Sequence, residues 1–236
     1  IFASIQKLHR HLDRFPSTFF DYIIIDEVHH ASAQSYQKIL SHFQPSFLLG
    51  LTATPVRSDG INIASLFHDH ICFEANLAEG IERDLLCPFH YIGRIDPVDY
   101  HPIPWRNGSF STAELEQALC SDKRMVLLDE LWKDVPGHKT IVFCASIKHA
   151  DHVALWLRQK GHRAISIHTG PTSSSRTEGI TALQEGELDA VCVVDLFNEG
   201  VDLPQTDRIV MLRPTTSSLL FLQQLGRGLR KSAGKS

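Results

Sequence analysis

The chain has 236 residues, of which 43% are hydrophobic and 21% are charged, a composition that indicates a folded globular protein with room for two compact units. Its formal net charge of −4 argues against a protein that coats duplex nucleic acid by general electrostatics, but it is compatible with a local basic groove. No apolar run approaches the roughly 20 residues of a membrane span. Because the start also lacks a signal-peptide pattern, we expect a cytoplasmic protein without a membrane partner.

The five cysteines are widely spaced and form no Cys-x-x-Cys pair, which argues against a disulfide framework and against a cysteine-rich zinc site. Ile1–Gln6 has the pattern of a strand that enters a loop, and no initiator Met precedes it. We therefore expect a fragment of a longer protein.

Apolar runs rich in β-branched residues alternate with segments of helical period, which is the pattern of parallel strands joined by crossover helices. The first part predicts, in order, a strand at 22–25, a helix at 32–43, a strand at 47–52, a helix at 61–67, a strand at 70–74, a helix at 77–83 and a strand at 89–95. The second part predicts helices at 112–120 and 123–132, a strand at 139–144, a helix at 147–160, a strand at 164–168, a helix at 174–185, strands at 190–194 and 208–212 and a helix at 217–225.

A proline-containing stretch at 96–110 separates the two parts and predicts a linker. The fold class is therefore α/β, with two parallel-sheet units side by side. We assign residues 1–95 to a first domain and residues 111–236 to a second domain.

The first strand, Tyr22–Ile25, is followed by Asp26 and Glu27, so two carboxylates lie at the carboxyl edge of a sheet, where open α/β sheets bind ligands. One carboxylate there can hold Mg²⁺ through its water shell while its neighbour orients an attacking water for NTP hydrolysis. The same two acids are equally compatible with the exposed N-cap of the next helix.

The next strand of the first part ends in Thr52-Ala53-Thr54-Pro55. Because Pro55 disfavours helix at the preceding residue, we expect Thr52 and Thr54 on an ordered turn, where their hydroxyls can hydrogen-bond to the acid cluster. An ordinary Thr-Pro loop would explain the same residues.

Near the end of the second part, Arg227 and Arg230 have a spacing that predicts a shared helix face suited to bidentate contact with phosphate oxygens. An arginine supplied across a domain cleft can stabilise the charge that develops during phosphoryl transfer. A solvated basic helix end is the simpler alternative. Acids and a glycine in Asp195–Asp202 follow another strand and face the same sheet edge.

Five segments, in chain order and on strand–loop–helix units, resemble motifs II to VI of the superfamily 2 helicases. They are Asp26–His29, Thr52–Thr54, Ile141–Cys144, Asp195–Asp202 and Gln223–Arg230. The last two are more narrowly similar to DEAD/DEAH-type helicases related to type III restriction translocation subunits. The resemblance covers nearly the whole chain and implies two RecA-like domains, the first truncated at its N-terminus. It also implies an enzyme that hydrolyses ATP in the cleft between these domains to move on or unwind nucleic acid.

The same resemblance implies ATP and Mg²⁺ as cofactors and assigns roles in the first domain. Asp26 would coordinate Mg²⁺ through water, Glu27 would be the general base, and His29 would link the nucleotide site to the second domain. Thr52 and Thr54 would couple hydrolysis to domain movement.

In the second domain, the resemblance implies that Gly200 and Asp202 line the nucleotide side of the cleft and that Gln223 contacts the phosphate region. Arg227 and Arg230 would be the arginine fingers.

The implied partner is single-stranded or duplex nucleic acid, contacted mainly through its phosphates, with DNA favoured by the restriction-type resemblance. Candidate contacts in the second domain are Ser146, Thr169, Gly170 and Arg176. Additional nuclease or accessory domains are compatible with the parent chain.

One family motif, the Gly-x-x-x-x-Gly-Lys-Ser/Thr loop that cradles phosphates, does not occur in this sequence. Gly234-Lys235-Ser236 resembles its end, but the preceding glycine, Gly228, leaves five intervening residues instead of four. We therefore expect this chain alone to bind ATP poorly and to hydrolyse little or none.

Two other functions stay open. The chain has 14 histidines, and the clusters His29-His30 and His68-Asp69-His70 suit a divalent-metal phosphohydrolase, although neither shows the H-E-x-x-H spacing. A non-catalytic nucleic-acid-binding scaffold is also compatible, but the intact acids and arginines argue against it.

Overall fold

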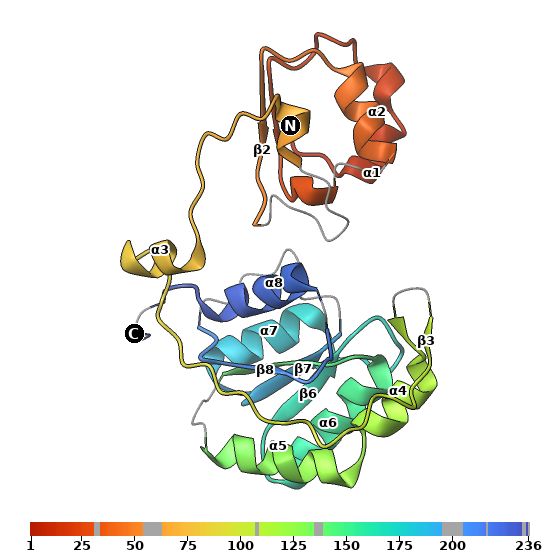
Figure 1. The fold of residues 1–236 in the computed structure, drawn as a ribbon, viewed down its shortest axis with the longest axis vertical. Helices are drawn as coiled ribbons and strands as arrows, with labels where there is room; N and C mark the ends of the chain where they lie inside the picture. The colour runs from red at the N-terminus through yellow and green to blue at the C-terminus, as the bar shows by residue number, and fades with distance from the viewer. Residues whose placement is uncertain are drawn as a thin grey trace. The chain divides into compact units, whose positions relative to one another are not determined.

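The computed structural model describes residues 1–30, 34–53, 63–106, 109–134, 139–194, 205–215, 217–232 and 235. The chain divides into two compact units, Ile1–Ala75 and Asn76–Ser236, and each is described here by itself (Figure 1). No helix among the described residues is long and apolar enough to cross a membrane.

The first unit is built around two parallel strands, β1 (Tyr22–Ile25) and β2 (Phe47–Gly50), which pair in register from Tyr22 opposite Phe47 to Ile25 opposite Gly50. Short helices accompany them: α1 (Ile5–His9), η1 (Leu12–Arg14), η2 (Val28–His30), α2 (Gln34–His42) and η3 (Ile63–Phe67). Ile25, Val28 and Ile63 form a buried apolar cluster. A Cβ at Gly50 would lie 2.5 Å from the Phe67 ring, so glycine is required where η3 packs on β2.

The second unit contains a four-stranded parallel sheet in the order β6-β7-β5-β8. Its strands are β5 (Thr140–Phe143), β6 (Ala164–Ile167), β7 (Ala190–Val193) and β8 (Arg208–Met211), and β5 and β7 are buried along their whole length. Continuous apolar β-branched sequence, as in Ile141-Val142, is what a parallel sheet covered on both faces requires.

Helices cover both faces of this sheet (Figure 1). On one face, Val142 and Cys192 pack with residues of α5 (Asp122–Asp134) and α6 (Ile147–Gln159). On the other, Ile141 and Val191 pack with Leu183 of α7 (Arg176–Glu185). This alternation follows the period of a strand, in which successive side chains point to opposite faces. The remaining helices are α3 (Leu77–Glu82), α4 (Thr112–Leu119) and α8 (Ser218–Gly228).

The expected α/β class and its parallel sheets are confirmed. The main differences from the expected elements fall in the part of the chain after β2 and before β5. The segments 70–74 and 89–95, expected as strands, form none, and no strand among the described residues pairs with either of them to complete a hydrogen-bond ladder. The expected helix at 61–67 is the short 3₁₀ helix η3.

The stretch expected as a linker contains a short antiparallel hairpin, β3 (Trp105–Arg106) with β4 (Ser109–Phe110). Asp96, at its start, accepts a 3.0 Å hydrogen bond from Arg124 Nε of α5 and a 2.7 Å bond from the Tyr100 hydroxyl. This stretch therefore packs within the second compact unit. The two compact units are defined by contacts within the chain, and they do not test where one domain family ends and the next begins. The boundaries 1–95, 96–110 and 111–236 therefore stay a prediction.

Candidate functional site

The ends of β1 and β2 bring two predicted motifs together in the first unit. The ladder continues past both strands, because Leu51 N donates to Ile25 O at 2.8 Å and Val28 N donates to Leu51 O at 2.9 Å. These two bonds hold the turn after β1 beside the residues after β2. The Thr52 hydroxyl, predicted to hydrogen-bond to the acid cluster, meets His29 of the same motif.

His29 is the centre of this contact. Its Nδ1 lies 3.2 Å from Thr52 Oγ1 and 3.3 Å from Glu27 Oε2, and its side chain is only 3% exposed. A buried imidazole between a carboxylate and a hydroxyl fixes both side chains relative to each other. The structure thus links three predicted site residues from two separate segments.

Asp26 and Glu27 do not form an ordinary helix cap. Glu27 has a left-handed backbone with φ of 50°, and its amide donates to Asp26 Oδ1 at 3.0 Å. A left-handed conformation is uncommon for a residue with a side chain and is frequent at functional sites. Asp26 is exposed at the sheet edge, and exposed carboxylate oxygens are donors that suit Mg²⁺. The donor set present therefore fits the metal that the resemblance implies.

The second unit has a pocket of about 520 Å³ at the carboxyl edge of its sheet. The residues that line it come from the loops after β5, β6 and β7, from α4 and from the start of α6: Thr112, Glu116, Ser146, Ile147, His168, Thr169 and Val194. Two of the four predicted nucleic-acid contacts, Ser146 and Thr169, are therefore brought together. Gly170 follows on the same loop, and Arg176 is the exposed first residue of α7.

Ser146 also has a structural task. It is the N-cap of α6, and its hydroxyl accepts a 3.2 Å hydrogen bond from the His149 amide. This satisfies one of the free N–H groups at the helix start. The hydroxyl lines the pocket while already serving as an acceptor.

Arg227 and Arg230 do not share a helix face, contrary to the prediction. Helix α8 ends at Gly228 with Leu229 as its C-cap, so Arg230 lies beyond the helix. Gly226 and Gly228 contribute to this helix end, because glycine weakens a helical turn. Arg227 is on α8 and is 8% exposed.

Gln223 also lies on α8, and its Nε2 atom is buried without a hydrogen-bond partner among the described residues. Burying an amide N–H without a partner is unfavourable. The atom is a donor available to a bound group, which fits the predicted contact with phosphate.

Three predicted site residues, Thr54, Gly200 and Asp202, lie outside the described residues. In the described part of the chain, no three His, Cys, Asp or Glu side chains form a group that could hold a metal ion. Within the cluster considered for a metal, His68 and Asp69 have left-handed backbones with φ of 53° and 58°.

Two residues of the pocket region were missed by the sequence reasoning, His168 and Asp151. They form a hydrogen bond in which His168 Nε2 lies 3.0 Å from Asp151 Oδ1. The position of His168 directly after β6, at the carboxyl edge of the sheet, is the same signal that pointed to Asp26.

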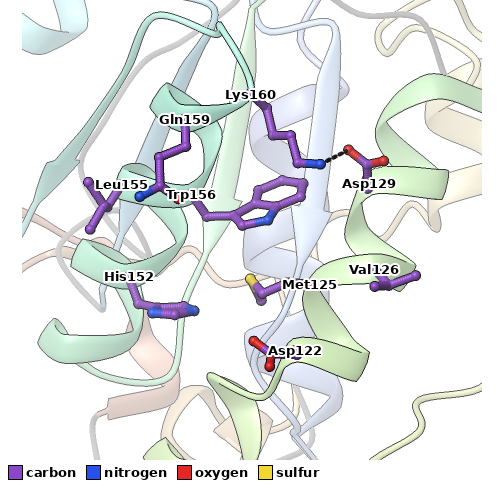
Figure 2. A pocket seen from close by; sticks show the side chains of 9 residues that line it. All are labelled: Asp122, Met125, Val126, Asp129, His152, Leu155, Trp156, Gln159 and Lys160. Carbon is purple, nitrogen blue, oxygen red and sulfur yellow. Dashed lines mark ion pairs between the residues drawn. The ribbon is translucent and has the colours of Figure 1, made fainter.

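A separate pocket of about 360 Å³ lies between α5 and α6 (Figure 2). The Trp156 side chain lies between the two helices in this view, and near it Lys160 Nζ pairs with Asp129 Oδ1 at 3.4 Å. None of the predicted site residues lines it.

The parallel sheets, with Asp26, Thr52 and Ser146 in the segments after their strands, have the α/β fold of RecA-like helicase domains. Residues 1–57 match the family model of the type III restriction enzyme res subunit, and residues 122–232 match the helicase conserved C-terminal domain. Both matches fit a superfamily 2 helicase-type fragment, similar to helicases and to subunits of type I and type III restriction enzymes.

Individual relatives agree with this family. The chain is 28% identical over 240 residues to the candidate ATP-dependent helicase IRC3 of Saccharomyces cerevisiae. This match covers 98% of this chain and 35% of the relative. It is 28% identical over 243 residues to the type I restriction enzyme EcoAI endonuclease subunit of Escherichia coli. This match covers 90% of this chain and 30% of the relative.

Among solved structures, a fragment of a candidate HsdR subunit of a type I restriction enzyme from Vibrio vulnificus is similar to this chain. It has 26% identity and a TM-score of 0.69, and the likeness covers 96% of this chain and 44% of the other. The chain spans less than half the length of each of these proteins.

Proposed function

We propose that the chain is part of an ATP-dependent helicase or translocase that uses ATP hydrolysis to move on or unwind nucleic acid, with DNA as the favoured track. The observation that carries this proposal is the contact of His29 with both Glu27 and Thr52. It joins the acid that would serve hydrolysis to a hydroxyl on the next strand end. The similarity to a type I restriction endonuclease subunit supports DNA over RNA.

In this proposal Asp26 holds Mg²⁺ through water, and Glu27 is the general base for the attacking water. The two carboxylates differ in a way that suits these tasks. Asp26 is exposed and has one oxygen held by the Glu27 amide, whereas Glu27 is 31% exposed and is held by His29. Bound Mg²⁺ would supply positive charge to the phosphate oxygens.

The coupling role falls to His29, Thr52 and Thr54. A change in the position of the Glu27 carboxylate would shift the His29 ring, and His29 in turn contacts Thr52. Because His29 is buried and contacts both side chains, it is placed to pass a displacement from one segment to the other.

In the second domain, Gln223 is proposed to donate to phosphate oxygens, and its buried Nε2 supports that role. Arg227 and Arg230 are proposed arginine fingers. Because Arg230 lies past the end of α8, the two guanidiniums act from different backbone settings. Gly200 and Asp202 complete the proposed nucleotide contacts.

The nucleic-acid backbone is proposed to contact the loops after β5 and β6, through Ser146, Thr169, Gly170 and the α7 start at Arg176. Hydroxyls, backbone amides and an exposed guanidinium are groups that bind phosphate without reading base sequence. The pocket that Ser146 and Thr169 share supports this assignment. We further propose that the protein acts in the cytoplasm and that 1–236 alone hydrolyses little ATP.

The test is the ATPase activity of the full-length parent protein with and without single-stranded DNA. We expect stimulation by DNA and a loss of at least about 100-fold in kcat for Glu27→Gln, since general-base catalysis contributes about that much or more. His101→Gln, at a side chain that is 99% exposed, is the matched control and should retain full activity. Activity that survives Glu27→Gln would refute the assigned base. A strand-displacement assay then separates unwinding from translocation alone.

A further inference from the structure

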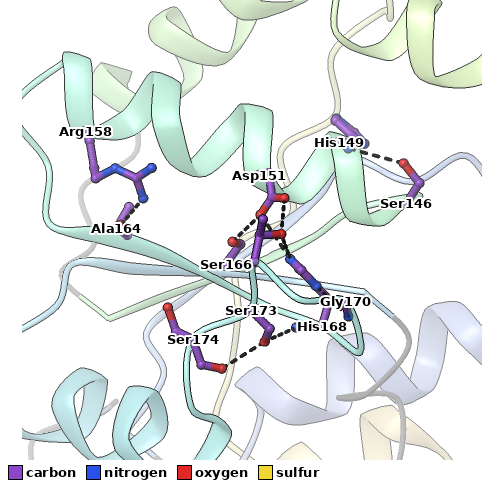
Figure 3. Close-up of polar contacts among 11 residues, drawn as sticks. Ser146, His149, Asp151, Arg158, Ala164, Ser166, His168, Gly170, Ser173 and Ser174 are labelled. Atoms are coloured by element: carbon purple, nitrogen blue, oxygen red, sulfur yellow. Dashed lines mark hydrogen bonds and ion pairs between the residues drawn. The ribbon is translucent and has the colours of Figure 1, made fainter.

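His168 is a fully buried histidine on the loop that follows β6. It comes directly after Ile167, the last residue of that strand, and its side chain is 0% exposed. Figure 3 shows its ring between α6 and the loop, pointing toward Asp151. The residues that the proposed function assigns to ATP hydrolysis do not include His168.

Both ring nitrogens of His168 have defined partners. Gly170 N donates to Nδ1 at 3.0 Å, and Nε2 lies 3.0 Å from Asp151 Oδ1 (Figure 3). Because a backbone N–H can only donate, Nδ1 must be the unprotonated nitrogen. The proton therefore resides on Nε2, which donates to the carboxylate, and the ring is neutral.

Asp151 is the anchor of this arrangement. Its carboxylate accepts hydrogen bonds from Ser166 Oγ at 2.5 Å and from Thr172 Oγ1 at 2.8 Å in addition to His168. Burial acts to raise the pKa of Asp151, but these hydrogen bonds outweigh it and lower the pKa below its ordinary value. The carboxylate is therefore charged and tied to α6, β6 and the loop.

The loop itself is closed by short-range bonds. His168 N donates to Ser173 Oγ at 2.9 Å, and Ser174 N donates to Ser166 O at 3.0 Å. A Cβ at Gly170 would lie 3.1 Å from His168 Nδ1 and 3.2 Å from Ile147 Cδ1, so glycine lets the backbone lie against the imidazole. The result is a fixed loop that leaves Thr169 exposed at the rim of the pocket.

We propose that His168 is a positioning residue for phosphate binding: its neutral ring, held by Asp151, accepts the Gly170 amide hydrogen bond and so keeps the 169–173 loop in the conformation that accepts a nucleic-acid backbone. This inference rests on the proposed function. Backbone amides and hydroxyls that are already oriented bind phosphate without a further loss of loop entropy. His168 acts through Gly170 and does not itself touch the ligand.

Two substitutions separate the two ring contacts. His168→Asn keeps an acceptor near the position of Nδ1 and loses the donor to Asp151. His168→Gln keeps a donor near the position of Nε2 and loses the acceptor for Gly170. If His168 served stability alone, both substitutions would change the stability of the protein. The affinity for nucleic acid would then not depend on which of the two ring contacts is lost.

The measurement is the Kd of the full-length parent protein for a fluorescent single-stranded oligothymidylate at constant salt, by anisotropy. We expect His168→Gln to raise Kd about tenfold and His168→Asn to change it by less than about threefold, since loss of one hydrogen bond accounts for about a tenfold change. His101→Gln should bind as the wild type does. Amide hydrogen exchange at Gly170 should speed up in His168→Gln and not in His168→Asn.

Gly170→Ala gives an independent arm if either histidine variant fails to fold. Its Cβ would displace the loop from an intact His168, so we expect the same rise in Kd as for His168→Gln. Equal Kd values for all variants and the wild type would overturn the positioning role alone. A wild-type protein that binds no oligonucleotide would overturn the proposed function, and the inference with it.

Discussion

The backbone amide of Cys87 donates a 2.9 Å hydrogen bond to the carbonyl of Leu229, directly after helix α8. The Cys87 thiol also donates to Gly228 O at 3.4 Å, and Asp84 forms an ion pair with Lys231. The segment after α3 therefore binds the segment that carries the predicted arginine fingers. This pairing holds the chain out of the helix at Leu229 and explains why Arg230 is not helical.

The two glycines of this helix end predict opposite effects on stability. A Cβ at Gly228 would lie 2.8 Å from Ile209 Cδ1, whereas a Cβ at Gly226 would meet no atom within 4 Å among the described residues. We expect Gly226→Ala to stabilise the chain by about 0.5–1 kcal/mol through helix propensity. We expect Gly228→Ala to destabilise it by about 1–2 kcal/mol through overpacking. Urea unfolding measures both, and the reverse order would contradict the packing of α8 on β8.

Thr52 offers a test of the coupling contact with His29. Thr52→Val removes the hydroxyl at nearly constant volume, and Thr52→Ser keeps it. In the full-length parent we expect DNA-stimulated ATPase activity to fall about tenfold for Thr52→Val, the effect of about one hydrogen bond, and to persist for Thr52→Ser. If the valine variant keeps wild-type stimulation, the hydroxyl has no part in coupling.

His149 predicts a loss of stability in weak acid. Its side chain is fully buried, and its Nδ1 accepts a 3.2 Å hydrogen bond from Ala145 N. Burial is the main cause that lowers its pKa from 6.5 to about 3, with smaller contributions from the charges of Arg124 and His152. Below pH 6.5, His149 therefore binds a proton in the unfolded chain but stays neutral in the folded chain until the pH approaches about 3.

The stability that neutral His149 provides is thus complete above pH 6.5 and is lost as the pH falls from there toward 3. The expected slope is up to about 1.4 kcal/mol per pH unit. His149→Asn keeps an acceptor for Ala145 N and cannot titrate, so its urea midpoint should fall less between about pH 7 and about pH 5. Parallel pH profiles for the variant and the wild type would sink this prediction.

The Asp96–Arg124 pair predicts that the stretch before β3 contributes to the stability of the second unit. The Arg124 side chain is 8% exposed and also donates to Leu212 O at 2.7 Å. We expect Asp96→Ala to destabilise the chain by about 1–3 kcal/mol, because it leaves a largely buried guanidinium without its carboxylate. Asp99→Ala is the control, because Asp99 and its partner His101 are both exposed, and the melting temperature should stay unchanged.

The absent phosphate-binding loop predicts that residues 1–236 alone do not respond to ATP. We expect no shift in melting temperature at micromolar ATP with Mg²⁺, because a ligand stabilises only a state that it binds. A clear shift at that concentration would mean that another segment of this chain holds the phosphates.

Much of the second unit could be predicted from sequence because its signals are local. The strand at Thr140–Phe143 and the helix at Ile147–Gln159 differ from their predicted bounds only at the ends, since a buried parallel strand and an amphipathic helix each have a clear apolar period. The segment 89–95 has similar apolar content and yet forms no strand. Apolar content alone does not supply the neighbouring strand that a ladder needs.

The sequence by itself predicted the α/β class from its apolar periods and the resemblance to superfamily 2 helicases from motifs such as those at Asp26, Thr52 and Arg227, because each of these signals can be recognised one segment at a time. Tertiary structure alone decided which side chains meet. The contacts of His29 with Thr52 and of His168 with Asp151 depend on strand register and on the packing of α6 against β6. Such contacts join residues far apart in the chain, and no local pattern of hydrophobicity or turn chemistry encodes a distance between them.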